Sequence, residues 1–261
     1  MTDSRQRQYA RPLLSAQARR PAAIALGCAV LILAGGAVLV HDQYTDPLDR
    51  RIGPWATARL GGHGTALHLV SDLGQKFAVI VMIAVICLAC LAARRLNGAV
   101  LAAVGASAAS VATEEVLKPL AEHLYVYAGY PSGHTTSFFA LIMTVAVLLS
   151  GLPASRAKAT IQIVIIATAV LIGCAISLAV VALGDHHFID TVGGAAVGIV
   201  VVLTVTFVLD LPVSRSLLGL AWASRRPPAA ASSLPNQGPP SPWQSAEQRT
   251  HEAGPVAGNE R

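Results

Sequence analysis

Residues 159–184 read ATIQIVIIATAVLIGCAISLAVVALG, a run of 26 residues that contains no charged side chain. An α-helix rises about 1.5 Å per residue, so about 20 apolar residues cross the hydrocarbon core of a bilayer, which is about 30 Å thick. This run is long enough to do so. It therefore predicts a transmembrane helix and places the chain among membrane proteins.

The rest of the chain has the same character. Of its 261 residues, 54% are hydrophobic and only 13% are charged, and its mean hydropathy is +0.57. A soluble domain carries about 25% charged residues. Five further uncharged runs occupy residues 22–40, 77–93, 98–113 (extendable to 117), 135–153 and 191–209. The sequence thus predicts an all-α, polytopic bundle of six transmembrane helices, in which the spacing of Gly194 and Gly198 suits close helix packing.

Basic residues predict the orientation of these helices, because cytoplasmic flanks carry an excess of Lys and Arg. With the N-terminus inside, 14 of the 19 basic residues fall on cytoplasmic segments. The five outer ones are Arg50, Arg51, Arg59, Lys76 and Lys118. We therefore expect a plasma (inner) membrane protein with both termini in the cytoplasm. The net charge of +5 reflects this asymmetry, and we expect no nucleic-acid partner.

The chain divides into three predicted parts. Residues 1–21 form a basic cytoplasmic segment, residues 22–210 form the membrane domain, and residues 211–261 are rich in Pro, Ser and Ala. Such a composition cannot bury a core, so the tail is predicted to be disordered and cytoplasmic. Within the outer segment 41–76, two stretches are expected to form short interfacial helices, with Trp55 at the level of the headgroups.

The polar residues that suit chemistry all fall on the predicted outer side. One outer segment, 114–136, ends in YPSGHTT, and another, 185–190, reads DHHFID. In the first, Ser132 is expected to cap a helix that begins near His134, after Gly133. The free N–H groups of such a helix start attract an anion such as phosphate. The imidazole of His134 can give or take a proton near neutral pH.

In the second outer segment, His186 and Asp190 are four positions apart. On a helix, this spacing places the carboxylate beside the ring, where it holds one tautomer and supports a positive imidazolium. His186 is therefore a candidate nucleophile that forms a covalent phosphoryl intermediate. His187 is expected on a different face, as a substrate contact or only a neighbour.

Two further residues are weaker candidates. Lys118 provides a cation on the same side, although it also suits an interfacial lysine that pairs with Glu114 at i,i+4. His123 lies in the same predicted loop and donates to a phosphate when protonated.

The order of Lys118, PSGH, and a histidine followed four residues later by Asp190 resembles the PAP2 (type 2 phosphatidic acid phosphatase) superfamily of lipid phosphatases. The resemblance covers roughly residues 22–210. It implies that His186 attacks phosphorus, that Asp190 supports it, and that His134 protonates the leaving oxygen.

The resemblance also implies a substrate and its binding groups. Ser132, Gly133 and Lys118 would hold the phosphate of a lipid substrate among membrane lipids, with no metal or other cofactor. The substrate would be phosphatidate-like or a prenyl diphosphate, and the oligomeric state stays open.

The sequence departs from the family pattern at two phosphate-binding arginines. Tyr125 and Val126 stand where an Arg-Pro pair is usual, and Ala179 and Val180 stand where a Ser-Arg pair is usual. Three interpretations stay open. An arginine of the first outer segment replaces the missing ones, or the substrate is a phosphodiester handled by headgroup transfer, or the chain is a non-catalytic relative that binds lipid headgroups.

Overall fold

The structure is a computed structural model that describes residues 12–41, 47–125, 129–152 and 156–211. The chain divides into two units, Met1–Leu220 and Ala221–Arg261, and all described residues lie in the first. Every regular element among them is a helix. The all-α prediction is therefore confirmed. The predictions for residues 1–11 and for the tail 212–261 lie outside the described residues.

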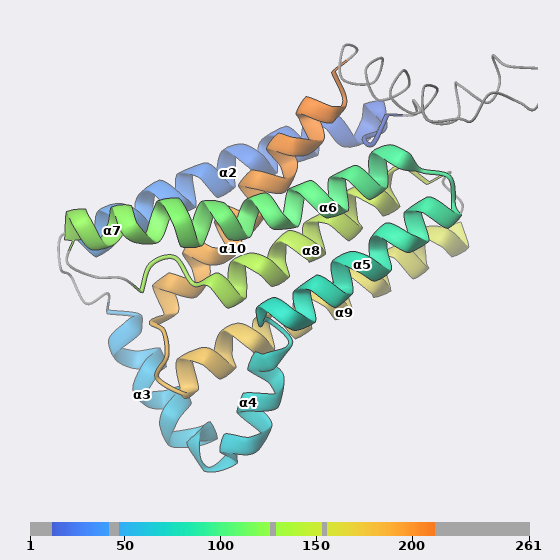
Figure 1. Ribbon diagram of the computed structural model, residues 1–261. Helices are drawn as coiled ribbons and strands as arrows, with labels where there is room; N and C mark the ends of the chain where they lie inside the picture. Colours follow the sequence, from blue (N-terminus) through green and yellow to red (C-terminus); the bar gives the residue numbers. More distant parts are fainter. Residues whose placement is uncertain (1–11, 42–46, 126–128, 153–155, 212–261) are drawn as a thin grey trace, which may run out of the picture. The chain divides into compact units, whose positions relative to one another are not determined.

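Six long helices form the bundle (Figure 1). They are α2 (Ala16–His41), α5 (Lys76–Ala92), α6 (Leu96–Val111), α8 (Gly133–Ser150), α9 (Arg156–Ala182) and α10 (Phe188–Leu209). Shorter elements are α3 (Asp49–Leu60), η1 (Gly61–His63), α4 (Gly64–Asp72), the π-helical η2 (Ala112–Leu117) and α7 (Lys118–Tyr125).

The helices account for the predicted membrane spans. Five stretches of the described chain are long and apolar enough to cross a membrane, and there are six if the bent pair Asp49–Asp72 and Lys76–Ala92 counts as one span. The predicted span 77–93 corresponds to α5, which is part of this bent pair. The chain is therefore a polytopic helical membrane protein.

Helix α10 packs against α8, α2 and α6, and α8 also packs against α6 and α9. Small residues bring α10 close to α8. A side chain on Gly198 would meet Ala140 N and Thr136 O at 2.7 Å, and one on Gly194 would collide with Ser132 O. The predicted close packing at these two glycines is confirmed.

Gly198→Ala is expected to lower the free energy of unfolding by about 1–3 kcal/mol, because the added methyl group pushes against backbone atoms that cannot rotate away. Thermal unfolding in detergent measures the effect. Gly27→Ala in α2 is the matched control, since nothing lies within 4 Å of that position. Equal melting temperatures for the two variants would contradict this account of the α8–α10 contact.

The start of α2 and the end of α10 lie together (Figure 1). The buried carboxylate of Asp210 accepts hydrogen bonds from the N–H groups of Leu13 (2.7 Å) and Leu14 (3.1 Å). The guanidinium of Arg19 lies 3.9 Å from the same carboxylate. Nothing in the sequence pattern indicated this contact, which joins two residues almost 200 positions apart.

The two short helices expected in the outer segment are present as α3 and α4. They do more than lie at an interface, because Ala56 and Leu67 form a buried cluster with Ala179, Val181 and Ala182 of α9. Trp55 is 53% exposed, and its place at the level of the headgroups stays a prediction.

The prediction of an outer loop over residues 114–136 was wrong for residues 114–125, which are helical. The chain stays helical from Leu96 through η2 and α7 to Leu124 in one stretch of sufficient length to span a membrane. Glu114 and Lys118 pair within this stretch, so their charges do not end it. Pro119 has no N–H to donate, and the wider π-helical turn ends at Leu117, two residues before it. Lys118 therefore belongs to a helix.

Other helix boundaries also differ from the prediction. Helix α2 begins at Ala16 rather than at 22, and its early residues Arg19 and Arg20 are exposed. Helices α8 and α10 each begin two or three residues earlier than predicted. The polar residues at these positions belong to the first helical turns, where side chains and water satisfy free N–H groups.

Candidate active site

The two motif segments meet at one end of the bundle, where α8 and α10 begin. The N–H of Ser132 donates a 2.9 Å hydrogen bond to the carbonyl of Asp190. Ser132 and Asp190 are both fully buried. PSGH and DHHFID, which lie more than 50 residues apart in the sequence, are thus joined through their backbones.

Tyr130 anchors the segment before PSGH. Its hydroxyl donates to the carbonyl of Leu33 at 2.8 Å, and its ring and hydroxyl lie against Gly36 of α2 and Gly193 of α10. A side chain at either glycine would collide with the tyrosine. Tyr130 was not among the predicted site residues, although a large aromatic side chain next to a motif can indicate the residue that anchors the motif to neighbouring helices.

The carboxylate of Asp190 lies behind the ring of His186. Nδ1 of His186 is 3.6 Å from Oδ2 of Asp190, and the His186 side chain is 13% exposed. Nδ1 is itself buried and has no hydrogen-bond partner among the residues that the structure describes. Since Nδ1 faces the carboxylate, Nε2 is the nitrogen left to meet a substrate.

The helical geometry expected for this pair was wrong, because His186 precedes α10. Asp190 lies in the first turn and accepts a 2.8 Å hydrogen bond from the N–H of His187, the residue that caps the helix. This capping contact turns the carboxylate back toward the start of α10. The cap, rather than a continuous helix, therefore brings Asp190 to His186.

His187 also faces Asp190, contrary to the expectation that it occupies a different face. Its Nδ1 lies 3.7 Å from Oδ2 of Asp190, and its side chain is 55% exposed. One buried carboxylate therefore serves two imidazoles, of which His186 is the more enclosed.

His134 is the second residue of α8 and is half-buried. It lies within electrostatic reach of His186, Asp185, Lys118 and Glu114. Gly74, in the turn between α4 and α5, packs against its backbone: a side chain there would come within 3.0–3.3 Å of His134 atoms. The backbone hydrogen bond from Ser132 to Asp190 holds the two segments that carry these imidazoles together.

Lys118 forms an ion pair beside PSGH. Its Nζ is 2.9 Å from Oε1 and 3.0 Å from Oε2 of Glu114. The same carboxylate lies against Gly133, where any side chain would collide with it. The predicted pairing of Lys118 with Glu114 is confirmed, and Lys118 also lies beside Gly133, while its role as a phosphate-binding cation stays a prediction. Glu114 was predicted only as the partner of Lys118, and its position beside Gly133 was not predicted.

The expected capping role of the Ser132 side chain is not observed. Ser132 precedes α8 with extended backbone angles, but its hydroxyl makes no capping hydrogen bond and instead accepts from Oγ1 of Thr135 at 3.4 Å. The Ser132 carbonyl accepts from Oγ1 of Thr136 at 2.9 Å. The hydroxyl therefore leaves the first N–H groups of α8 uncapped, a start that suits an anion.

These residues lie in a stretch of the chain that matches a known protein family. The family model of the PAP2 superfamily matches residues 105–211. Residues 105–211 belong to the PAP2 superfamily. Its members generally hydrolyse phosphate esters. No curated protein and no solved structure matches the chain.

The PAP2 region contains Lys118, PSGH and the His186–Asp190 pair, and it excludes α2 to α5. It also contains the positions of the missing arginines. Ala179 and Val180 are 1% and 0% exposed, and Ala179 belongs to the cluster that Ala56 joins from α3. An arginine at either position would have to replace a buried apolar side chain. The side chain of Tyr125 and all of Val126 lie outside the described part of the structure.

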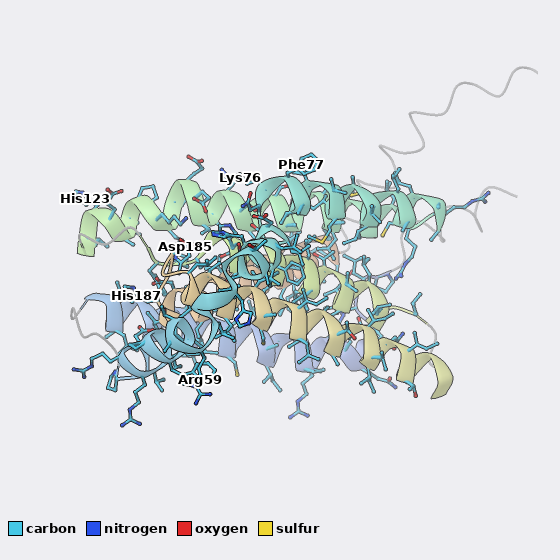
Figure 2. The ribbon with its side chains drawn as sticks, turned by 90° about the horizontal axis from the view of Figure 1, so that it is seen from below. Arg59, Lys76, Phe77, His123, Asp185 and His187 are labelled. Atoms are coloured by element: carbon cyan, nitrogen blue, oxygen red, sulfur yellow. The ribbon has the colours of Figure 1, made fainter. Side chains whose placement is uncertain are left out.

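A cavity of about 520 Å³ lies beside His186 and His187. Its other lining residues include Asp185 from the segment before α10 and Asp49 and Arg50 from α3, which lies outside the PAP2 region. Figure 2 labels Asp185 and His187, which come from this segment, and Arg59, which lies near the end of α3.

Asp49 fastens α3 to the start of α10. Its Oδ1 accepts a 3.2 Å hydrogen bond from the N–H of Ile189. Burial raises the pKa of the Asp49 carboxyl, while the N–H groups of Ile189 and Phe188 and the charge of His187 oppose that rise. Desolvation thus dominates, and Asp49 is a structural clamp at the edge of the cavity.

His123 is not brought to this cavity. It is exposed on α7, and Figure 2 shows it well separated from Asp185 and His187. His123 is therefore not part of the candidate site.

Proposed function

We propose that the protein is an integral-membrane phosphatase that releases phosphate from a lipid phosphate monoester or diphosphate through a phosphohistidine on His186. The observation that supports this most is the backbone hydrogen bond from Ser132 to Asp190, which joins the segment of His134 to that of His186, beside a buried Asp190 carboxylate that lies 3.6 Å from Nδ1 of His186. A site that only bound headgroups would need cations and donors, and it would have no use for a carboxylate that orients an imidazole.

The proposed reaction has two steps. Nε2 of His186 attacks phosphorus and forms a P–N bond, while the bond from phosphorus to the leaving oxygen breaks and that oxygen takes a proton from His134. Water then attacks the phosphohistidine and gives its proton to His134, the P–N bond breaks, and inorganic phosphate leaves. Asp190 stabilises the positive charge on His186 during both steps.

The phosphate would be held by three groups near the start of α8. They are the Ser132 hydroxyl, the N–H groups that begin at Gly133, and the ammonium of Lys118. Because Lys118 already pairs with Glu114, it would have to share its charge between the carboxylate and the phosphate. His187, exposed at the cavity, would contact the substrate without reacting.

We place the site at the external face of the plasma membrane, with the termini in the cytoplasm. The distribution of basic residues supports this, since 14 of the 19 lie on the segments assigned to the inside. The amphipathic substrate would present its phosphate at the boundary and leave its chains in the bilayer.

The function is tested with a substrate panel. Purified protein in detergent, with a chelator present, is given phosphatidate, a prenyl diphosphate, and a phosphodiester lipid together with a second lipid alcohol. We expect inorganic phosphate from one of the first two substrates. Release of no phosphate from either, with no transfer product, would contradict an enzyme of this kind and leave a headgroup-binding protein.

A headgroup phosphotransferase that uses the same two histidines and Asp190 is the second candidate. The pairing of Glu114 with Lys118 favours it, because this pair offers less positive charge than the dianion of a monoester attracts. A phosphodiester carries a single negative charge. Movement of a headgroup to the second alcohol, with little free phosphate, would establish this function instead.

A further inference from the structure

Helix α3 lines the cavity beside His186 and is held there by two hydrogen bonds. Asp49, its first residue, accepts a hydrogen bond from the N–H of Ile189 at the start of α10. One turn before its end, the hydroxyl of Thr57 donates to the carbonyl of Ala182 at 3.3 Å. Ala56 is fully buried against the same end of α9. The helix is thus held by both chain segments that flank His186.

This attachment lies next to the position at which the family has an arginine. Val180 stands at that position and is buried, so it supplies no cation. Its neighbour Ala179 packs into the apolar cluster that α3 joins. The segment of α9 that lacks the arginine is therefore the segment on which α3 packs.

Arg50 is the basic residue that α3 brings to the cavity. It lines the same 520 Å³ space as Asp185, His186 and His187. Arg50 and Arg51 are both exposed, but Arg51 is not part of this lining, because adjacent residues of a helix point about 100° apart. Arg59 lies at the outer edge of the structure in Figure 2.

The charges around the cavity make a cation necessary for phosphate. Asp185 and Asp49 line it, and Asp190 lies behind His186. Lys118 is paired with Glu114. A guanidinium is always charged, and it binds two phosphate oxygens at once through parallel N–H donors.

We propose that Arg50 binds the substrate phosphate and replaces an arginine that the family motif supplies from α9. This inference rests on the proposed function for its substrate class. It assigns a specificity-determining residue to a helix outside the PAP2 region, positioned by Asp49 and Thr57.

The kinetic test compares variants of the full-length protein in detergent with phosphatidate as substrate. Arg50→Ala is expected to lower kcat/KM by about 10²-fold, as loss of one preorganised donor does. Arg50→Lys restores part of the loss, because an ammonium keeps the charge without the paired donors. Arg51→Ala is the matched control and stays within about twofold of the wild type. If Arg50→Ala is as active as Arg51→Ala, the inference is overturned.

A binding test separates this inference from the proposed function. Binding of fluorescent phosphatidate is measured by titration in the His186→Gln background, in which no turnover occurs. Arg50→Ala is expected to raise the Kd by about tenfold or more, and Arg51→Ala leaves it unchanged. If the wild type shows no turnover but this difference persists, the phosphatase fails and the Arg50 site stands. Equal affinities of the two variants, or no binding by either, would overturn the Arg50 site whatever the turnover. Equal melting temperatures confirm that both variants fold.

Discussion

His186→Gln is expected to lower phosphate release by at least about 10⁴-fold, because the amide has no ring nitrogen to attack phosphorus. Glutamine is close to histidine in size, so the packing of this nearly enclosed side chain is kept. Initial rates of phosphate release in detergent measure the effect. This is the largest change we expect from any single substitution.

A covalent intermediate gives a second measurement of the same prediction. Brief incubation of the wild type with substrate labelled in its phosphate, followed by alkaline denaturation, should leave the label on the protein, and acid should remove it. His186→Gln should carry no label. His63→Gln, which alters an exposed histidine of η1, is the matched control and should label normally. Labelled His186→Gln protein would show that another residue is the nucleophile.

His134→Gln is expected to lower phosphate release from a lipid alcohol ester by about 10²–10⁴-fold, because the departing alkoxide then receives no proton. The size of the loss depends on the leaving group. An aryl phosphate releases a far less basic oxygen, so its first step needs little protonation and should lose much less. Rates for a lipid phosphate and an aryl phosphate, measured on the same preparation, check the prediction.

The ratio of the two losses separates a general acid from a positioning role. A residue that only holds the site together would slow both substrates equally when replaced. Equal losses for His134→Gln would therefore contradict the proton-donor role, while His186→Gln should abolish both reactions and so provides the reference. Because Gly74 packs on the His134 backbone, the melting temperature of His134→Gln is measured as well.

Most of the fold could be predicted from composition and run length. An uncharged stretch of sufficient length must span a membrane or be buried in a protein core. Every predicted run corresponds to a helix of the structure. The error at residues 114–125 shows the limit of this reasoning. A charged residue was treated as the end of a span, but Glu114 and Lys118 neutralise each other on one helix face, and the helix continues.

The site was predictable only in part. The side chains that suit acid, nucleophile and orienter chemistry were apparent from their types and spacing, as at His134, His186 and Asp190. Their geometry was not. Asp190 meets His186 through a helix cap, and it faces His187 as well.

The sequence by itself determined the membrane helices and the two motif segments, because run length and residue type are properties of one continuous stretch of chain. It also determined the Glu114–Lys118 pair, whose members lie four positions apart on a helix. Only the tertiary structure decided that Glu114 lies against Gly133, that Asp49 clamps α10, and that Arg50 rather than Arg51 faces the cavity. Each of these contacts depends on how separate helices pack. Packing is set by close fits such as that of α3 on the small residues of α9, which no periodicity along the chain records.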